Sequence, residues 1–358
     1  MTERRRPGRL IARLFLSGAL MLAAAASLLA AGVASADRAV SSALTAVSGL
    51  MILMAIVIVV APLSIWRRVL TPERRLSLQV FFSNRPAVVG LAIVLAYVAD
   101  ALIVQFAPWL IGIRHPYTVI PNFANPLPEP PSWKHPLGTT YPGIDLLRAI
   151  VKAIRLDLAL SVAVVLPGAA IGIVIGIIAT YFGGWIDDVL MRLTDVFFSV
   201  PYLVLAVAIG YVLGRTLDSM IYALIVVWWP LYARYTRSVT LQVKELTFIE
   251  AARAAGASNT KIMFRHILPN ALPPVLVQAS MDLGTIMLTI SALAFIGFLP
   301  VANIPELGYL TTLGLNYVNT APWTVIVPGA FIVIFAVAVY LMGMGLMDVI
   351  NPRRRSSL

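Results

Sequence analysis

The sequence contains no cysteine, which excludes disulfides, thiolate metal sites and cysteine nucleophiles. Its three histidines, His115, His135 and His266, do not cluster with the helical spacing of metal ligands, and no Ser/His/Asp constellation accompanies them. The phosphate-binding pattern Gly-x-x-x-x-Gly-Lys-[Ser/Thr] is missing too, so no phosphate cradle of that kind is predicted. On these grounds we expect neither an enzyme nor a resident metal or cofactor.

Charged residues are also scarce, at 12% of the chain, whereas a soluble domain carries about 25%. Hydrophobic residues make up 60% and come in long blocks rather than in the alternating pattern of a membrane β-barrel. The predicted fold class is therefore all-α, a polytopic helical membrane protein. The net charge of +11 fits basic loops beside an anionic membrane face better than nucleic-acid binding.

Eight segments approach the roughly 20 apolar residues that a membrane-spanning helix needs. They are Leu10–Ala36, Ala43–Trp66, Pro86–Leu110, Leu158–Phe182, Val196–Leu213, Met220–Tyr235, Ala271–Leu299 and Trp323–Met347. The fifth and sixth are short, and one re-entrant feature is the alternative for them. For residues 1–36 the alternative is a cleaved signal peptide, because basic residues and an apolar stretch precede Ala34-Ser-Ala36.

The distribution of basic residues predicts the orientation of these spans. If the N-terminus is cytoplasmic, 20 of the 27 Lys and Arg residues fall on the cytoplasmic side. The reverse orientation would violate the positive-inside rule. Both termini are therefore predicted to be cytoplasmic, in a multi-pass protein of the prokaryotic inner or plasma membrane. Residues 111–157 become an external loop, rich in proline at first and amphipathic from Ile144 onward, as in a helix lying at the membrane surface.

A polar segment, residues 243–270, interrupts the apolar blocks on the cytoplasmic side. Good helix formers fill Val243–Ala255, and Gly256 is suited to end that helix. Ser258 or Asn259 can cap a second short helix that runs through Phe264–Ile267, and Pro269 marks its end. Small alanines, among them Ala251 and Ala252, leave a low surface on which another protein can sit. Glu250 is placed there to pair with a partner's arginine.

This segment resembles a motif of the membrane subunits of ATP-binding-cassette importers. The motif reads EAA, three residues, G, nine residues, and I-x-L-P; here Glu250-Ala251-Ala252, Gly256 and Leu268-Pro269 keep its spacing. His266 stands in place of the isoleucine, in the form Arg265-His-Ile-Leu-Pro-Asn270 that is similar to the dipeptide, oligopeptide and nickel branch.

Other stretches resemble the C-type permease subunit of that branch, over about Leu78 to Arg354. They are His135-Pro-Leu-Gly-Thr139 with Gly143 and Asp145, Tyr181-Phe-Gly-Gly-Trp185 with Met191-Arg-Leu-Thr-Asp-Val196, Ala292-Leu-Ala-Phe-Ile-Gly297, and Ala321-Pro-Trp323. The chain departs from the branch at Thr140 and Ile144, where an acid and an arginine are usual. It also lacks the tryptophan that usually precedes the glycine at Gly308. The first 75 or so residues have no counterpart in the branch.

The resemblance implies a six-span permease core, residues 78–358, behind an N-terminal extension, residues 1–77, with two candidate spans. It implies that residues 243–270 are a cytoplasmic coupling segment received by an ATPase subunit, with Glu250 and Gly256 as its main residues. The implied partners are a second homologous permease, two ATPase subunits that bind ATP-Mg, an external substrate-binding protein and membrane lipid. Peptides are the expected substrates, with nickel chelates or oligosaccharides as alternatives.

The seventh predicted span carries polar residues spaced four, three and four apart, on one helix face. They are Gln278, Asp282, Thr285 and Thr289. Because a carboxylate inside a span usually faces a bundle interior or an aqueous cavity, we expect this face to line a translocation path. Hydrogen bonding between helices is the alternative. Asp100, one turn after Tyr97 in the third span, is a weaker candidate of the same kind.

Two readings from other classes remain open. A secondary transporter or channel acting alone would need no ATPase and gives no reason for the Glu250 segment. A membrane scaffold for an ATPase would carry no substrate.

Overall fold

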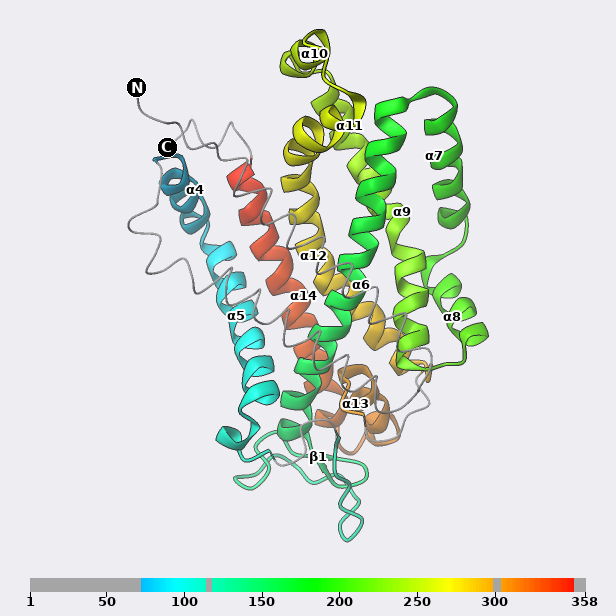
Figure 1. Ribbon diagram of the computed structural model, residues 1–358. Coiled ribbons are helices and arrows are strands. Elements are labelled where there is room, and N and C mark those ends of the chain that lie inside the picture. The colour runs from blue at the N-terminus through cyan, green and yellow to red at the C-terminus, as the bar shows by residue number, and fades with distance from the viewer. Residues whose placement is uncertain (1–71, 114–117, 299–303, 351–358) are drawn as a thin grey trace. The chain divides into compact units, whose positions relative to one another are not determined.

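The computed structural model describes residues 72–113, 118–298 and 304–350, and most of these are helical (Figure 1). Four helices are long and apolar enough to cross a membrane: α5 (Arg85–Phe106), α6 (Leu146–Phe182), α12 (Leu268–Phe295), which continues α11, and α14 (Trp323–Ile350). The all-α membrane fold is confirmed. The first two predicted spans, and nearly all of the predicted extension 1–77, lie outside the described residues.

The third, seventh and eighth predicted spans correspond to α5, α12 and α14 within a few residues. The sixth corresponds to α9 (Leu217–Lys244), which is 28 residues long but carries Arg234, Arg237 and Lys244 in its last third. α9 is not among the helices that meet the length and apolarity of a span. The described residues therefore give four such helices and one bent pair where six core spans were expected.

The prediction of a separate surface helix before the fourth span is wrong. α6 begins at Leu146, where Asp145 Oδ1 accepts the Arg148 N–H at 2.9 Å, and runs unbroken for 37 residues. Its length of about 55 Å exceeds the roughly 30 Å apolar core of a bilayer. The helix continues because its outer cations are paired. Lys152 Nζ donates to the Thr118 carbonyl at 2.8 Å, and Arg155 Nη1 donates to Gln105 Oε1 at 2.7 Å.

The fifth predicted span, Val196–Leu213, is not one helix. The structure places α7 (Gly184–Phe198) and α8 (Tyr202–Leu213) there, bent by 87° at the break between them. Pro201 stands just before α8, and its ring and missing N–H disfavour a helix that continues through it. The residues between the fourth and fifth predicted spans form most of α7.

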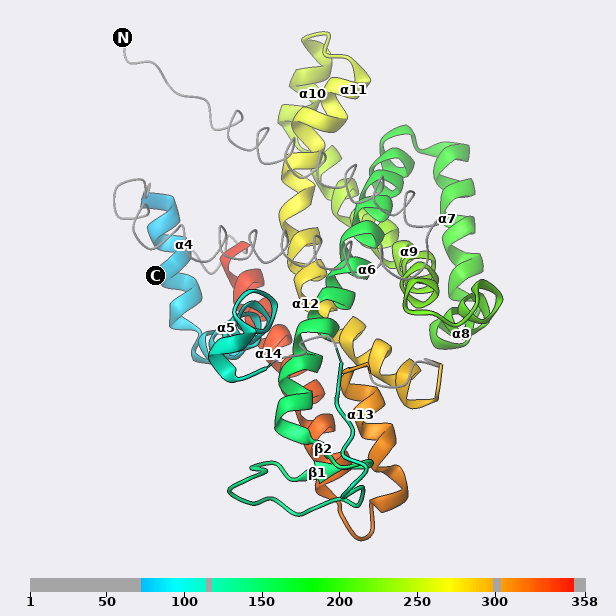
Figure 2. The same cartoon turned by 60° about the horizontal axis from the view of Figure 1, so that its bottom comes forward.

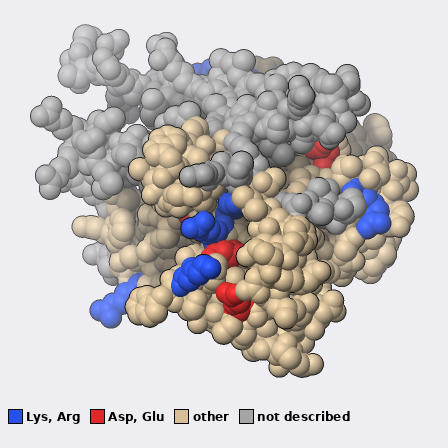
Figure 3. Space-filling view, turned by 90° about the horizontal axis from the view of Figure 1, so that it is seen from below, with Lys and Arg blue, Asp and Glu red and all other residues tan. Residues whose placement is uncertain are grey.

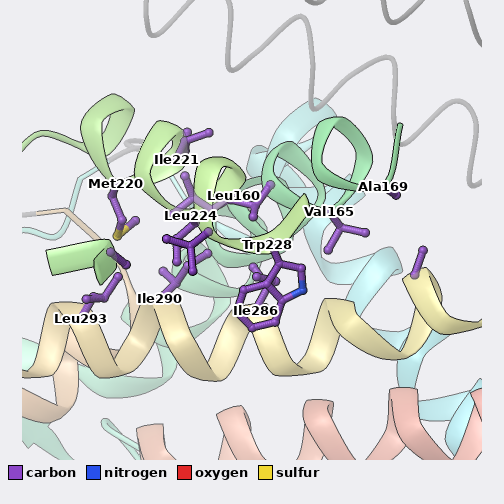
Figure 4. Close-up of a cluster of buried hydrophobic side chains, with 14 of the residues drawn as sticks. Leu160, Val165, Ala169, Met220, Ile221, Leu224, Trp228, Ile286, Ile290 and Leu293 are labelled. Atoms are coloured by element: carbon purple, nitrogen blue, oxygen red, sulfur yellow. The ribbon is translucent and has the colours of Figure 1, made fainter. Parts of the chain in front are cut away.

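The most extensive helix contact in the described bundle joins α6 to α9, and glycines of α6 allow a close approach there. A Cβ at Gly172 would lie 2.4 Å from the Tyr232 Cβ, and one at Gly176 would lie 2.6 Å from the Ala233 carbonyl oxygen. Small residues four apart allow such close approach of two helices in membranes. Beside this seam, apolar side chains of α6, α9 and α12 meet in one buried cluster, including Leu160, Leu224, Trp228, Ile286 and Ile290 (Figure 4).

The external loop forms an ordered structure at one end of the described bundle (Figure 2). It contains the 3-10 helix η1 (Pro108–Ile111) and the paired two-residue strands β1 (Thr139–Thr140) and β2 (Ile144–Asp145). α6 begins at Leu146, so the predicted loop 111–157 includes the first twelve residues of this helix. Trp323 Nε1 donates to the Thr139 carbonyl at 3.2 Å, which ties the loop to α14.

The remaining described elements flank this bundle. α13 (Leu307–Gly314) and the 3-10 helix η3 (Leu315–Tyr317) lie between α12 and α14 in sequence, beside the external loop (Figure 1). At this end, a few charged side chains of both signs lie close together among uncharged ones (Figure 3). α4 (Pro72–Ser83) precedes α5, with Asn84 as the N-cap of α5.

Candidate functional site

Two short helices project at the end of the bundle opposite the external loop (Figures 1 and 2). They are α10 (Thr247–Ala254) and α11 (Asn259–Ile262). Gly256, at φ +76°, ends α10: its N–H donates to the Arg253 carbonyl, and the Ala257 N–H donates to the Ala252 carbonyl at 3.1 Å. These are the two hydrogen bonds of a Schellman motif, which requires a left-handed residue at this position. The predicted glycine elbow is present.

One side of α10 is exposed to solvent, and the opposite side packs on the bundle. Glu250, Ala251, Arg253 and Ala254 are exposed, and Ala252 is half-buried. Ile249 on the opposite side is fully buried, as are Ile262 of α11 and Ile267. A Cβ at Gly256 would meet nothing within 4 Å, so the elbow itself is open. The helix therefore presents a carboxylate among small residues at its tip while apolar side chains hold it to the bundle.

The second short helix differs from the prediction. Ser258 is its N-cap, with Oγ 3.4 Å from the Lys261 N–H, but α11 does not stop before Pro269. It runs through a π-helical turn, Met263–Ile267, directly into α12. A π turn widens the backbone, and Asn270 Nδ2 donates to the His266 carbonyl at 2.6 Å. The helix therefore accommodates the proline, so that Leu268 and Pro269 belong to the first turn of α12 rather than to the projecting tip.

Contacts that the sequence did not predict join this tip to α6. The Tyr181 hydroxyl, in the last turn of α6, donates to Asn259 Oδ1 at 2.8 Å. Lys244 Nζ, at the end of α9, donates to the carbonyls of Thr180 at 3.1 Å and Tyr181 at 3.4 Å. The only sequence signal for these contacts was that Tyr181 opens a stretch resembling the permease family.

Ion pairs hold α7 against α9 near the same end. Arg237 makes two parallel hydrogen bonds to the Asp187 carboxylate, the one from Nε being 2.7 Å long. Arg234 pairs with Asp195. The two arginines of α9 thus have carboxylate partners on α7, which is a geometry that fixes orientation as well as distance. Both arginines fall on the predicted cytoplasmic side, but the sequence gives no signal for their partners on α7.

Only some of the polar residues predicted to form one face of α12 contact one another in the structure. Gln278 Nε2 donates to Asp282 Oδ1 at 2.9 Å, and Asp282 is 5% exposed. Thr289 is buried and donates its hydroxyl hydrogen to the Thr285 carbonyl at 2.8 Å, whereas Thr285 itself is exposed. The four residues follow the predicted helical spacing but do not share one accessible surface.

Asp282 faces the α9 side chains Trp228 and Tyr232. The Trp228 indole N–H and the Tyr232 hydroxyl interact with this carboxylate, although neither they nor its Oδ2 make a hydrogen bond of ordinary geometry among the described residues. The sequence analysis found Asp282 but missed these two aromatic residues.

Asp100 lies apart from this cluster in sequence and on a different helix. It is half-buried on α5, a helix that packs on α14 and α6, and its Oδ2 has no hydrogen-bond partner in the described part of the chain. The neighbouring Tyr97 hydroxyl donates to the Phe331 carbonyl of α14 at 2.7 Å.

Comparisons with known proteins identify the family of this chain. The chain is 36% identical over 273 residues to the dipeptide transport system permease protein DppC of Alkalihalophilus pseudofirmus, covering 76% of this chain and 88% of that protein. It is 33% identical over 285 residues to the di/tripeptide transport system permease protein DppC of Pseudomonas aeruginosa, covering 78% and 92%. A chain of the MetNI methionine ABC transporter aligns with a TM-score of 0.48 at 22% identity, over 57% of this chain and 96% of that chain. Residues 172–356 match the family model of the binding-protein-dependent transport system inner membrane component, and the chain belongs to that family.

Proposed function

We propose that this chain is a membrane subunit of an ATP-driven peptide importer, coupled to ATPase subunits through residues 243–270. The observation that carries the proposal is the geometry of α10. An exposed helix with Glu250 among alanines projects from an apolar bundle and ends in a Schellman glycine. A membrane protein needs no such projection merely to reverse the chain, whereas a groove on a partner could receive it.

The coupling requires that a displacement of α10 reach the long helices. α9 leads into α10 through Glu245 and Leu246, and α11 continues into α12 without a break. A partner that moves the tip therefore acts on the two helices that carry Tyr232 and Asp282. When two ATPase subunits close on ATP, the segments of two paired permeases would approach each other and tilt these helices.

The orientation follows from charge. The positive-inside rule favours the face that holds Arg253, Lys261 and Arg265 as the cytoplasmic face. Both termini are then cytoplasmic, in a prokaryotic inner or plasma membrane. The external loop is left to meet a substrate-binding protein, and the fully exposed Trp133 is its most prominent apolar side chain.

The peptide substrate rests on the relatives and on one polar cluster. The two similar permeases belong to dipeptide and di/tripeptide transport systems by name. Asp282, Trp228 and Tyr232 supply a carboxylate, an indole N–H and a hydroxyl between α9 and α12. A peptide offers an ammonium group, carbonyls and a carboxylate to such groups. We place the translocation path along this side of α12, with Gln278 and Thr285 beside it and Thr289 deeper in the bundle.

Charge reversal at the tip tests the proposal. We expect Glu250→Lys, and separately Gly256→Val, to abolish peptide uptake while the protein stays in the membrane at its normal level. Valine is a sharp choice because the left-handed conformation is especially unfavourable for a β-branched residue. Asp188→Lys is the matched control, since Asp188 is an exposed acid on α7, outside residues 243–270. Normal uptake by both the Glu250 and the Gly256 variants would overturn the proposal.

A further inference from the structure

The end of α6 contacts the coupling segment although it is distant from it in the sequence. The Tyr181 hydroxyl donates to Asn259 Oδ1, which belongs to the first residue of α11, at 2.8 Å. Tyr181 is only 9% exposed, whereas Asn259 is exposed. No chain connection leads directly from residues 243–270 into α6. A displacement of the segment therefore reaches α6 through tertiary contacts, and these two side chains make one of them.

Lys244 makes a second link between the same two parts. It is the last residue of α9, and its ammonium group donates to the carbonyls of Thr180 and Tyr181. The last carbonyls of a helix lack partners within the helix, and a cation near them is favourable. Lys244 thus binds the end of α6 directly, and it is joined to α10 by only two residues.

These hydrogen bonds restrict how the coupling segment can move relative to α6, whereas its hydrophobic anchor does not. The buried Ile249, Ile262 and Ile267 hold the segment to the bundle, but hydrophobic contact is not directional and permits sliding. Hydrogen bonds fix both distance and angle. We propose that Tyr181, Lys244 and Asn259 form a polar joint that passes displacement of the coupling segment to α6. This proposal rests on the function proposed above for residues 243–270.

The joint lies near the place where α6 packs most closely on α9. One turn before Tyr181, α6 meets α9 at Gly176, where a Cβ would lie 2.6 Å from the Ala233 carbonyl oxygen. Two backbones in such contact move together, because close-packed interiors transmit strain. The three residues of the joint are positioning residues.

The test measures uptake per ATP hydrolysed by the complete transporter in proteoliposomes, with a radiolabelled mixture of di- and tripeptides as the probe. We expect Tyr181→Phe to retain ATP hydrolysis and lower the ratio of uptake to hydrolysis about fivefold or more, which is the lower end of typical coupling between two sites. Asn259→Ala, on the exposed side of the same bond, should lower the ratio equally, and the double variant should lower it no further. Lys244→Met should behave similarly, whereas Lys244→Arg should retain coupling because it keeps a donor to the carbonyls.

Tyr340→Phe is the control, since Tyr340 is an exposed tyrosine on α14. A normal ratio in Tyr181→Phe and Asn259→Ala would overturn the joint, and so would a proportional fall in uptake and hydrolysis, which indicates a merely structural contact. If Tyr181→Phe fails to assemble, Asn259→Ala decides by the same criteria. Failure of the joint alone leaves Glu250→Lys inactive, whereas failure of the proposed function leaves Glu250→Lys active.

Discussion

The carboxyl groups of Asp157 and Glu306 are both fully buried where α6, α12 and α13 meet. Glu306 is the N-cap of α13: its Oε2 accepts the Tyr309 N–H at 2.6 Å, and its Oε1 accepts the Ser291 hydroxyl at 3.0 Å. Asp157 Oδ2 accepts the Leu307 N–H at 3.1 Å, while its Oδ1 has no partner among the described residues. Two buried like charges cannot both ionise without a large cost, and the hydrogen bonds favour Glu306 as the site of the single charge.

This asymmetry predicts that the two acids tolerate amide substitution differently. Glu306→Gln replaces one of two accepting oxygens by a donor, so a buried donor of Ser291 or Tyr309 is left unsatisfied. We expect it to lower the free energy of unfolding by about 1–3 kcal/mol. Asp157→Asn keeps an acceptor for the Leu307 N–H and, like the protonated acid, is neutral, so we expect less than about 1 kcal/mol. Thermal unfolding of the purified protein in detergent measures both, and equal losses would contradict the assignment.

The same pair predicts a pH dependence of stability. Burial raises the pKa of the Glu306 carboxyl above its ordinary value. The folded protein then binds more protons than the unfolded protein between the two pKa values, so stability falls as pH rises through that range. We expect the Tm to fall as the pH rises above the ordinary pKa of a glutamate, and to fall less in Glu306→Gln, which lacks this titrating group. Parallel Tm curves for the two proteins would show that Glu306 does not contribute.

The glycine seam between α6 and α9 predicts a steric effect. A Cβ at Gly176 would lie 2.6 Å from the Ala233 carbonyl oxygen and 2.8 Å from the Thr236 Cβ. We expect Gly176→Ala to cost about 1–3 kcal/mol of stability, because the backbones must separate. Gly329→Ala on α14 is the control, since a Cβ there meets nothing within 4 Å and alanine favours a helix. Thermal unfolding should rank the variants in that order, and an unaffected Gly176→Ala would show that the seam is not tight.

The proposed path along α12 predicts a pattern of thiol accessibility, and the chain without native cysteines is suited to measure it. Thr285 is exposed, Thr289 is buried and Asp282 is nearly so. We expect polar thiol reagents to label Thr285→Cys, to label Asp282→Cys only while ATP and peptide drive transport, and to leave Thr289→Cys unlabelled. If neither Asp282→Cys nor Thr285→Cys is labelled in a working transporter, this face does not line the path.

Much of the architecture follows from sequence because its causes are local. The apolar blocks predict α5, α12 and α14, and the glycine at 256 predicts the elbow. Pro269 misled the prediction because a π turn lets a helix pass a proline. The charges of α6 suggested a surface helix because their partners, Gln105 and Thr118, are distant in sequence.

No local sequence pattern indicates the contacts that organise the site. Tyr181 and Asn259 are 78 positions apart, and Asp157 and Leu307 are 150 apart. Glycines four apart on α6 are typical of close helix packing, but the spacing alone does not say which helix is the partner. Pairings of this kind depend on the tertiary arrangement and were beyond sequence reasoning.

The most direct test of the central claim is a cross-link from the tip of α10. Ala254→Cys, on the exposed side of α10, would carry a photoactivatable thiol reagent in membranes that contain the complete transporter. Leu127→Cys, on the exposed external loop, is the matched control. We predict that the cross-linked product from Ala254→Cys contains an ATPase subunit and that the product from Leu127→Cys does not. An ATPase cross-linked from Leu127→Cys and not from Ala254→Cys would contradict the account.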